Sequence, residues 1–263
     1  MKERTVLAYS GSAASSAAIR RLVDEHATDV VALTLDLGAG GELQEIHERA
    51  LALGAVRAHV IDAREEFADS YLLPALQAGA LDGRPETIDA LARPLIAKRL
   101  LEIARIERAG SVAHAASADS GLDTLIHAID ADMPIVDAGS TGPGLQQSGL
   151  GSSALAVDAA PRKSTAPDNG ADVEITFDRD VPVAINGVPM SLTELIESLT
   201  VIAVQHGLTR VRGYAGAPAL AVLQAAFNAR ASDEATTIVR LKLQDGATTA
   251  AVVAGSELAA PRS

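Results

Sequence analysis

One short segment near the amino terminus carries the residues best suited to holding an anion. It is rich in hydroxyl groups and lies between an apolar run and an amphipathic run: Ser10, Gly11, Ser12, Ser15 and Ser16. A loop between a strand and a helix offers unpaired backbone N–H groups and the positive end of a helix dipole, which attract phosphate. Glycine lets the backbone approach closely, and hydroxyls add donors. The pattern predicts an anion or nucleotide site, although a plain strand-to-helix turn with Ser15 as the N-cap also explains it.

The other residues with chemical potential are scattered. Asp36 ends an apolar run, where a carboxylate can bind a ribose hydroxyl or simply close a turn. Arg93 and Lys98 share one helical stretch and could face a nucleotide. His114 and His127 could pair as metal ligands, but they lie on different elements without a third ligand, so core or surface roles are favoured. The chain has no cysteine, hence no thiolate nucleophile. We therefore predict no metal site and assign no catalytic residue.

The first half of the chain alternates brief apolar runs with amphipathic ones. The apolar runs predict buried parallel strands over five ranges: Thr5–Tyr9, Val30–Asp36, Ala58–Asp62, Ser111–Ala115 and Ile135–Val136. The amphipathic runs predict helices: Ser15–His26, Leu43–Leu53, Glu65–Ala80 and Ala90–Ala109. Strand–helix alternation of this kind predicts an α/β fold with a doubly wound, Rossmann-like parallel sheet.

The second half of the chain differs in composition and in hydrophobic pattern. Residues 138–170 are rich in Gly, Ser, Pro and Ala and predict a linker or loop. After it, alternating runs predict two strands joined across Asn186-Gly187, a tight-turn signal. Ser191 and Glu194 form the capping box of a helix that runs to His206. A helix over Ala217–Ala231 and a hairpin across Asp245-Gly246 complete a smaller α+β domain. We expect domains at 1–137 and 171–263.

Composition excludes several classes of partner. Aromatic residues make up only 2% of the 263 residues, and the net charge is −12. An acidic surface repels nucleic-acid backbones and anionic lipid, and few rings are available to stack on bases. No stretch is long and apolar enough to cross a membrane, and the first residues lack a signal peptide. We therefore expect a cytoplasmic protein that binds neither nucleic acid nor membrane.

Several stretches resemble argininosuccinate synthases in the same order along the chain. The opening Val6-Leu7-Ala8-Tyr9-Ser10-Gly11 is similar to the family's A-Y-S-G-G-L-D-T-S loop. The run from Ala90 to Lys98 is nearly identical to the family's A-L-A-R-P-L-I-A-K. Further matches follow the second and third strands, at Leu35-Asp36-Leu37-Gly38 and at Asp62-Ala63-Arg64-Glu65-Glu66-Phe67. Val181–Gly187 and His206–Arg210 extend the resemblance into the second half.

The resemblance implies an N-terminal nucleotide-binding domain of the ATP-pyrophosphatase type and a C-terminal synthetase domain. Such enzymes use ATP and magnesium to adenylate citrulline, after which aspartate displaces AMP. They are tetramers, held together by a C-terminal helical extension. By resemblance we expect a homo-oligomer, and because the sequence stops at Ser263 we expect it to lack that tail.

The chain departs from the family where the resemblance assigns chemistry. In the first loop, Ser12, Ala13 and Ala14 replace Gly, Leu and Asp. After the fourth strand only His114 matches, with Ser117 as a weak stand-in for Thr. The family's Lys, Asn, Asp and Arg are replaced there, in order, by Asp119, Gly121, Leu122 and Leu125. Loss of the guanidinium removes bidentate carboxylate recognition, and Asp119 repels phosphate.

Three hypotheses follow. The first is a degenerate paralogue without synthase activity that keeps anion or nucleotide binding, and the inert replacements favour it. The second is an active ATP-dependent carbon–nitrogen ligase with an altered substrate. The third is a regulatory or structural subunit. Any ligand is expected around Ser10, Gly11, Ser15, Ser16 and Arg93, with phosphate, sulfate or AMP favoured over ATP and magnesium bound only with ATP.

Overall fold

The computed structural model describes residues 3–38, 43–81, 84–116, 120–139, 170–208, 214–230, 236–244 and 246–253. The chain forms two compact units. The first comprises Met1–Phe67, Ile88–Val157 and Arg212–Tyr214. The second comprises Ala68–Thr87, Asp158–Val211 and Ala215–Ser263.

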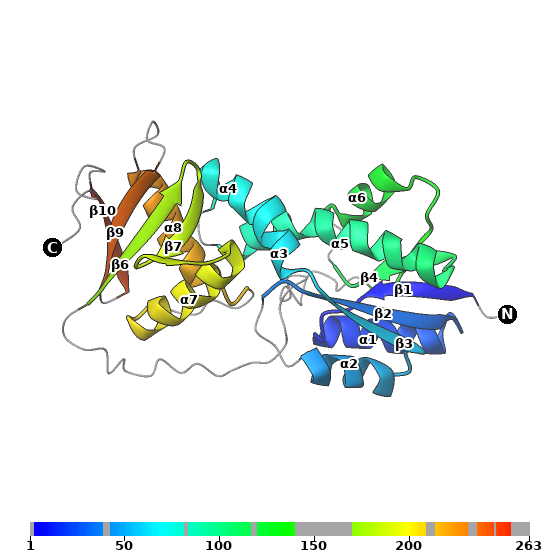
Figure 1. Ribbon diagram of the computed structural model, residues 1–263. Helices are drawn as coiled ribbons and strands as arrows, with labels where there is room; N and C mark the ends of the chain where they lie inside the picture. Colours follow the sequence, from blue (N-terminus) through cyan, green and yellow to red (C-terminus); the bar gives the residue numbers. More distant parts are fainter. Residues whose placement is uncertain are drawn as a thin grey trace. The chain divides into compact units, whose positions relative to one another are not determined.

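The first unit is built on a parallel sheet of five strands (Figure 1). Its strands are β1 (Arg4–Ala8), β2 (Asp29–Asp36), β3 (Arg57–Asp62), β4 (Ser111–His114) and β5 (Ile135–Asp137). Their order is β3-β2-β1-β4-β5, and each neighbouring pair is parallel. The chain runs outward from β1 to β3 and then returns to the other side of β1 for β4. The order therefore reverses between β1 and β4, and the predicted doubly wound sheet is confirmed.

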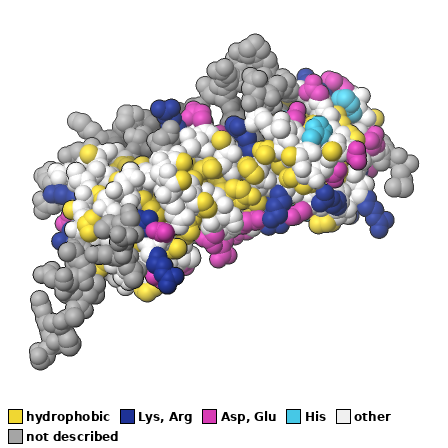
Figure 2. Space-filling model, turned by 90° about the horizontal axis from the view of Figure 1, so that it is seen from above, with side chains coloured by type: hydrophobic (Ala, Val, Ile, Leu, Met, Phe, Trp, Pro, Cys, Tyr) yellow, Lys and Arg dark blue, Asp and Glu magenta, His cyan; other side chains and the backbone are white. Residues whose placement is uncertain are grey.

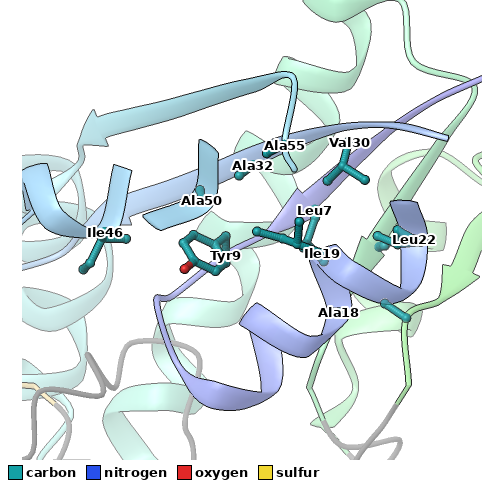
Figure 3. Close-up of a cluster of buried hydrophobic side chains, with 12 residues drawn as sticks. Leu7, Tyr9, Ala18, Ile19, Leu22, Val30, Ala32, Ile46, Ala50 and Ala55 are labelled. Carbon is teal, nitrogen blue, oxygen red and sulfur yellow. The ribbon is translucent and has the colours of Figure 1, made fainter. Parts of the chain in front are cut away.

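Helices cover both faces of this sheet. In Figure 1, α1 (Ala13–Asp24) and α2 (Leu43–Ala52) lie on one face, and α5 (Pro85–Glu107) and α6 (Leu122–Ile129) lie on the other. Figure 3 shows side chains of β1, β2, α1 and α2, among them Leu7, Ile19 and Val30, pointing into one apolar layer. Double coverage explains why the central strands are almost continuously apolar.

One predicted helix is wrong. The run 65–80 was expected to be a single helix, but it forms α3 (Arg64–Phe67), a π-helical turn (Ala68–Leu72) and α4 (Leu73–Gln77). Pro74 is the physical reason. Proline has no N–H to donate, and its ring clashes with the carbonyl four residues earlier, so a proline in a helix favours a local distortion, although α5 continues through Pro94. The widened π turn takes up the misfit, and Pro74 lies in the first turn of α4, where no N–H is needed.

The second unit contains an antiparallel sheet with the order β10-β9-β6-β7-β8. Its strands are β6 (Ala171–Asp178), β7 (Val181–Ile185), β8 (Val188–Pro189), β9 (Thr236–Gln244) and β10 (Ala247–Val253). Helix α7 (Leu192–Gln205) packs along β7, and α8 (Ala217–Ala229) packs along β9 and β10. The smaller α+β part is thus confirmed.

Local signals in this unit behave as predicted. The capping box at the start of α7 is formed, with Glu194 N–H bonded to Ser191 Oγ at 3.3 Å and Ser191 N–H bonded to Glu194 Oε2 at 2.8 Å. Asn186 and Gly187 have φ angles of 50° and 76°, as a tight hairpin turn requires. The second hairpin pairs β9 with β10, although Asp245 in its turn lies outside the described residues.

The antiparallel sheet has one apolar and one charged face. In β9, Val239, Leu241 and Leu243 are buried, while Arg240 between them is exposed and pairs with Glu174 of β6 at 2.5 Å. Such alternation is the mark of a sheet that is covered by helices on one side only.

The predicted linker at 138–170 lies almost entirely outside the described residues, so its two boundaries stay predictions.

In the view of Figure 2, acidic and basic side chains of the described residues alternate along one border of the surface. None of the helices in the described parts of the chain combines the length and the apolar character that a membrane span needs.

Candidate functional site

The reversal of strand order sets the place of the candidate site. Ligands of doubly wound sheets bind at the carboxyl ends of the strands where the order reverses. In the first unit these are the ends of β1 and β4, and the loop from Ser10 to Ser12 leaves β1 there and enters α1. The hydroxyl-rich segment predicted from the sequence therefore lies at the switch point.

The helix begins three residues earlier than the alternative interpretation assumed. Ser12, not Ser15, is the N-cap of α1, because its Oγ accepts the N–H of Ser15 at 3.2 Å. Its backbone is extended, with φ −69° and ψ 162°, as an N-cap requires. Ser15 is already inside the first turn, so its assignment as the cap was wrong.

The hydroxyl groups of this loop bond to one another. Ser12 Oγ lies 3.1 Å from Ser10 Oγ and 3.0 Å from Ser15 Oγ, and Ser10 Oγ lies 3.4 Å from Ser15 Oγ. Ser12 and Ser15 are each only 2% exposed. Ser16 Oγ instead pairs with the hydroxyl of Tyr9 at 3.3 Å. These hydroxyls hold the turn together, so most of them are already satisfied without a ligand.

The backbone of this loop offers free hydrogen-bond donors, whereas most of its hydroxyls are already bonded. Among the described residues, the N–H groups of Ala13 and Ala14, the first two of α1, have no hydrogen-bond acceptor. Both residues have small side chains and lie at least partly exposed. The first turn of α1 therefore presents free donors together with the positive end of its dipole.

Gly11 is required by its conformation and by its neighbour. Its φ is +74°, and a Cβ added there would lie 3.1 Å from Cγ1 of Ile46 in α2. A second contact from α2 reaches the same residue, since Arg49 Nη1 donates to the Gly11 carbonyl at 3.2 Å. Arg49 was missed because only the packing of α2 beside β1 brings it there.

Asp36 closes a turn at the end of β2. Its Oδ1 accepts the N–H of Gly38 at 2.9 Å, and its other oxygen lies 3.5 Å from Nε of Arg64. Arg64 also binds Asp62, and the hydrogen bonds from its guanidinium hold the pKa of the Asp62 carboxyl below its ordinary value. The ring of Tyr214 lies against Gly38. Asp36 thus has the turn role that the sequence allowed, and its predicted contact with a ribose stays a prediction.

The stretch most similar to the synthases has a structural role, because its end takes part in ion pairs with α3. Lys98 Nζ bonds Glu66 Oε1 of α3 at 2.8 Å, and Arg99 pairs with the same carboxylate and with Glu102. The hydrogen bond from Lys98 lowers the pKa of Glu66. Arg93 is half-buried, and no described hydrogen bond joins it to the Ser10–Ser16 loop. Its grouping with that loop stays a prediction.

The exit of β4 is organised around a histidine. His114 Nδ1 accepts the N–H of Ala116 at 3.2 Å, and its Nε2 pairs with the carboxylate of Asp123 in the first turn of α6. Both ring nitrogens are therefore engaged by residues of the same segment. Asp123 was not singled out from the sequence, and α6 was not among the predicted helices.

Within the described ranges, no three His, Asp or Glu side chains come together as a metal would need. Asp119, predicted to face phosphates, lies outside the described residues.

Comparison with known proteins decides the family. Residues 4–147 match the model described as the arginosuccinate synthase N-terminal HUP domain, and residues 157–213 match the arginosuccinate synthase C-terminal domain. The chain belongs to the argininosuccinate synthase family. The resemblance inferred from the sequence is confirmed.

Individual relatives agree with the family models. Argininosuccinate synthase of Listeria monocytogenes EGD-e is 35% identical over 254 residues, which cover 80% of this chain and 63% of that protein. The synthase of Streptococcus suis 05ZYH33 is 34% identical, with 80% and 64% covered. The chain thus spans less than two thirds of these synthases. Among solved structures, NAD+ synthetase from Burkholderia pseudomallei is 27% identical, with a TM-score of 0.32 and coverage of 43% and 44%.

Proposed function

We propose that this argininosuccinate-synthase-like protein has no synthase activity and retains a site for a small anion at the loop after β1. One observation carries the proposal. His114 is the only clear family match at the β4 exit, and both its nitrogens are engaged, by Ala116 and Asp123. The residue that should face substrates is instead tied to its own segment.

Charge at the switch point supports the same conclusion. Asp119 stands where the synthases have Lys, and Leu125 stands where they have Arg. Replacing an attractive charge by a repulsive one near phosphate changes the interaction energy by about 1 kcal/mol or more at close range. An aliphatic side chain cannot replace the two-pronged contact of a guanidinium with a carboxylate. Binding of ATP, magnesium, citrulline and aspartate in a reactive arrangement is therefore disfavoured.

The loop after β1 depends less on side chains. The N–H groups of Ala13 and Ala14 are free within the described structure, and backbone donors survive any substitution that keeps the turn. Arg49 adds a cation 3.2 Å from the Gly11 carbonyl. Phosphate, sulfate or the single phosphate of AMP suits such a site better than the triphosphate of ATP, because the sequence has Asp119 where the synthases have Lys.

The catalytic half of the proposal is tested by turnover. The purified chain, given ATP, magnesium, citrulline and aspartate, should release pyrophosphate only at the background rate. A synthase from Listeria monocytogenes, assayed in parallel, shows that the conditions support the reaction. Turnover approaching that of this control would refute the proposal.

The binding half is tested by calorimetric titration of phosphate, AMP and ATP. Arg49→Gln should weaken binding of phosphate and AMP by about fivefold, because it removes roughly 1 kcal/mol of attraction to the anion. Arg20→Gln changes an exposed arginine on α1 and should leave the affinity unchanged. If the wild-type chain binds none of the three ligands, the loop is only a turn. If Arg49→Gln binds like wild type, the anion is not held beside Arg49 and the proposed place of the site is wrong.

A further inference from the structure

A buried carboxylate lies at the amino-terminal edge of the parallel sheet, at the opposite end of the strands from the candidate site. Glu107 is the last residue of α5, and its side chain is only 3% exposed. Three side chains donate to it. Arg57 Nη1 lies 2.9 and 3.1 Å from the two carboxylate oxygens, His59 Nε2 lies 2.9 Å from Oε1, and Arg4 Nη1 lies 3.1 Å from Oε2.

These contacts join segments that are distant in sequence. Arg4 begins β1 and is 103 residues from Glu107, whereas Arg57 begins β3 and is 50 residues away. Arg4 Nη1 also donates to the Glu107 backbone carbonyl at 2.8 Å. One carboxylate thus connects the start of β1, the start of β3 and the end of α5.

Strand β3 needs such a connection more than its neighbours do. It is the edge strand and, within the described residues, pairs only with β2. None of its six residues is buried, whereas five of the eight residues of β2 are. Val60 on β3 is 36% exposed. Apolar burial therefore stabilises β2 strongly and β3 weakly, and polar contacts must contribute more of the attachment of β3.

Charge explains why this contact depends on the carboxylate. Glu107 faces two guanidinium groups, and removing its charge leaves the half-buried Arg4 and the more exposed Arg57 without this partner. At this end of the sheet the ionisable groups include Glu3 before β1, Arg4 at the start of β1, Asp29 at the start of β2, Arg57 and His59 on β3, Arg105 in the last turn of α5 and Arg108 directly after it.

We infer that Glu107 is a latch that fastens the edge strand β3 to the sheet. Loss of the carboxylate frees β3 locally while β1 and β2, held by apolar burial, stay protected. The latch is independent of whether an anion binds at the loop after β1.

Acid should release the latch. Burial raises the pKa of Glu107, but hydrogen bonds from His59 and Arg57 more than offset this, so the pKa lies below its ordinary value. A carboxylate with a lowered pKa contributes stability that is present above its unfolded-state pKa and is lost as the pH falls through the folded-state pKa. The attachment of β3 is therefore complete at neutral pH and weakens only in acid.

Native-state hydrogen exchange of the whole chain, followed by NMR at pH 7, tests the latch. In Glu107→Gln the amides of β3 should exchange about tenfold faster or more, while those of β1 and β2 change much less. Glu102→Gln removes a more exposed carboxylate from the same helix, one that pairs with Arg99, and should leave β3 unchanged. Equal acceleration in all strands, or β3 exchange as in wild type, would overturn the inference.

Two further measurements keep the inference testable if the first variant does not fold. If Glu107→Gln does not fold, Arg57→Gln replaces a side chain that is 62% exposed and should speed β3 exchange severalfold. Wild-type exchange rates in Arg57→Gln would overturn the latch. In wild type, β3 protection relative to β2 should fall as the pH is lowered below the ordinary range of a glutamate. In Glu107→Gln the same ratio should stay flat, and a parallel fall in both proteins would contradict the inference.

Discussion

The loop after β1 and the exit of β4 lie side by side at the carboxyl edge of one sheet, yet they differ in how far they depart from the synthases. The loop keeps its first glycine and presents free helix N–H groups at Ala13 and Ala14, and the replacement Ser12 serves as the cap. The exit keeps His114 alone as a clear match, and that side chain is tied to Asp123. The two segments have the same location but have not kept the same chemistry.

The difference teaches which kinds of site survive substitution. Backbone donors at a helix N-terminus need only the correct turn, so changes of side chain leave them in place. Recognition by Lys, Asn, Asp and Arg depends on those side chains themselves, and no backbone group replaces them. The proposed function rests on this difference, because it combines loss of the reaction with an anion site that is built from backbone groups.

The largest expected effect comes from two glycines with matching backbone angles. Gly11 has φ +74° with Ile46 at 3.1 Å from an added Cβ, whereas Gly121 at the β4 exit has φ +73° with nothing within 4 Å. Gly121→Val should lower the free energy of unfolding by about 1–2 kcal/mol from backbone strain. Gly11→Val should lower it by about 2–5 kcal/mol, because overpacking is added. Urea denaturation measures both, and equal losses would contradict the closer packing of the loop.

A smaller effect tests the cap of α1. Ser12→Ala removes the acceptor of the Ser15 N–H and should lower the free energy of unfolding by about 1 kcal/mol, the usual contribution of an N-cap. Ser10→Ala serves as the control, since Ser10 is half-buried and caps nothing. If thermal or urea unfolding shows the two variants to be equal, Ser12 has no special place in the loop.

The smallest effect is expected at the β4 exit. Asp123→Asn removes the charge that faces His114, but the Asp123 side chain is 55% exposed, so the free energy of unfolding should fall by less than about 1 kcal/mol. Asp132→Asn, at another exposed aspartate, should change nothing measurable. A loss of several kcal/mol at Asp123 would show that this exit is as tightly built as the loop after β1.

Features with short-range causes could be predicted from the sequence. The capping box of Ser191 and Glu194 and the turn at Asn186-Gly187 depend on residues within a few positions of each other, and both formed as expected. The helix over 65–80 failed for the opposite reason. Its apolar periodicity continues past Pro74, and only the geometry of the missing N–H breaks it into α, π and α turns.

The candidate site likewise combines features that could be predicted from the sequence with features that could not. The place of the Ser10–Ser16 loop follows from strand–helix alternation, because the carboxyl end of β1 must face the reversal of strand order. The sequence favoured Ser15 as a possible cap for α1, whereas the cap is Ser12, and this choice depends on where the backbone leaves β1. Arg49 and Asp123 could not be assigned to the site, since neither lies in a matching motif and both reach it from neighbouring elements.

By itself the sequence determined the family, the alternation of elements and the chemical losses at the β4 exit, because residue types and their order are enough for these. Tertiary structure alone decided that Arg49 reaches Gly11, that Asp123 engages His114 and that Glu107 collects two arginines and a histidine. Each of these contacts joins residues 9 to 103 positions apart. Their partners are chosen by sheet order and helix packing, which no local pattern records.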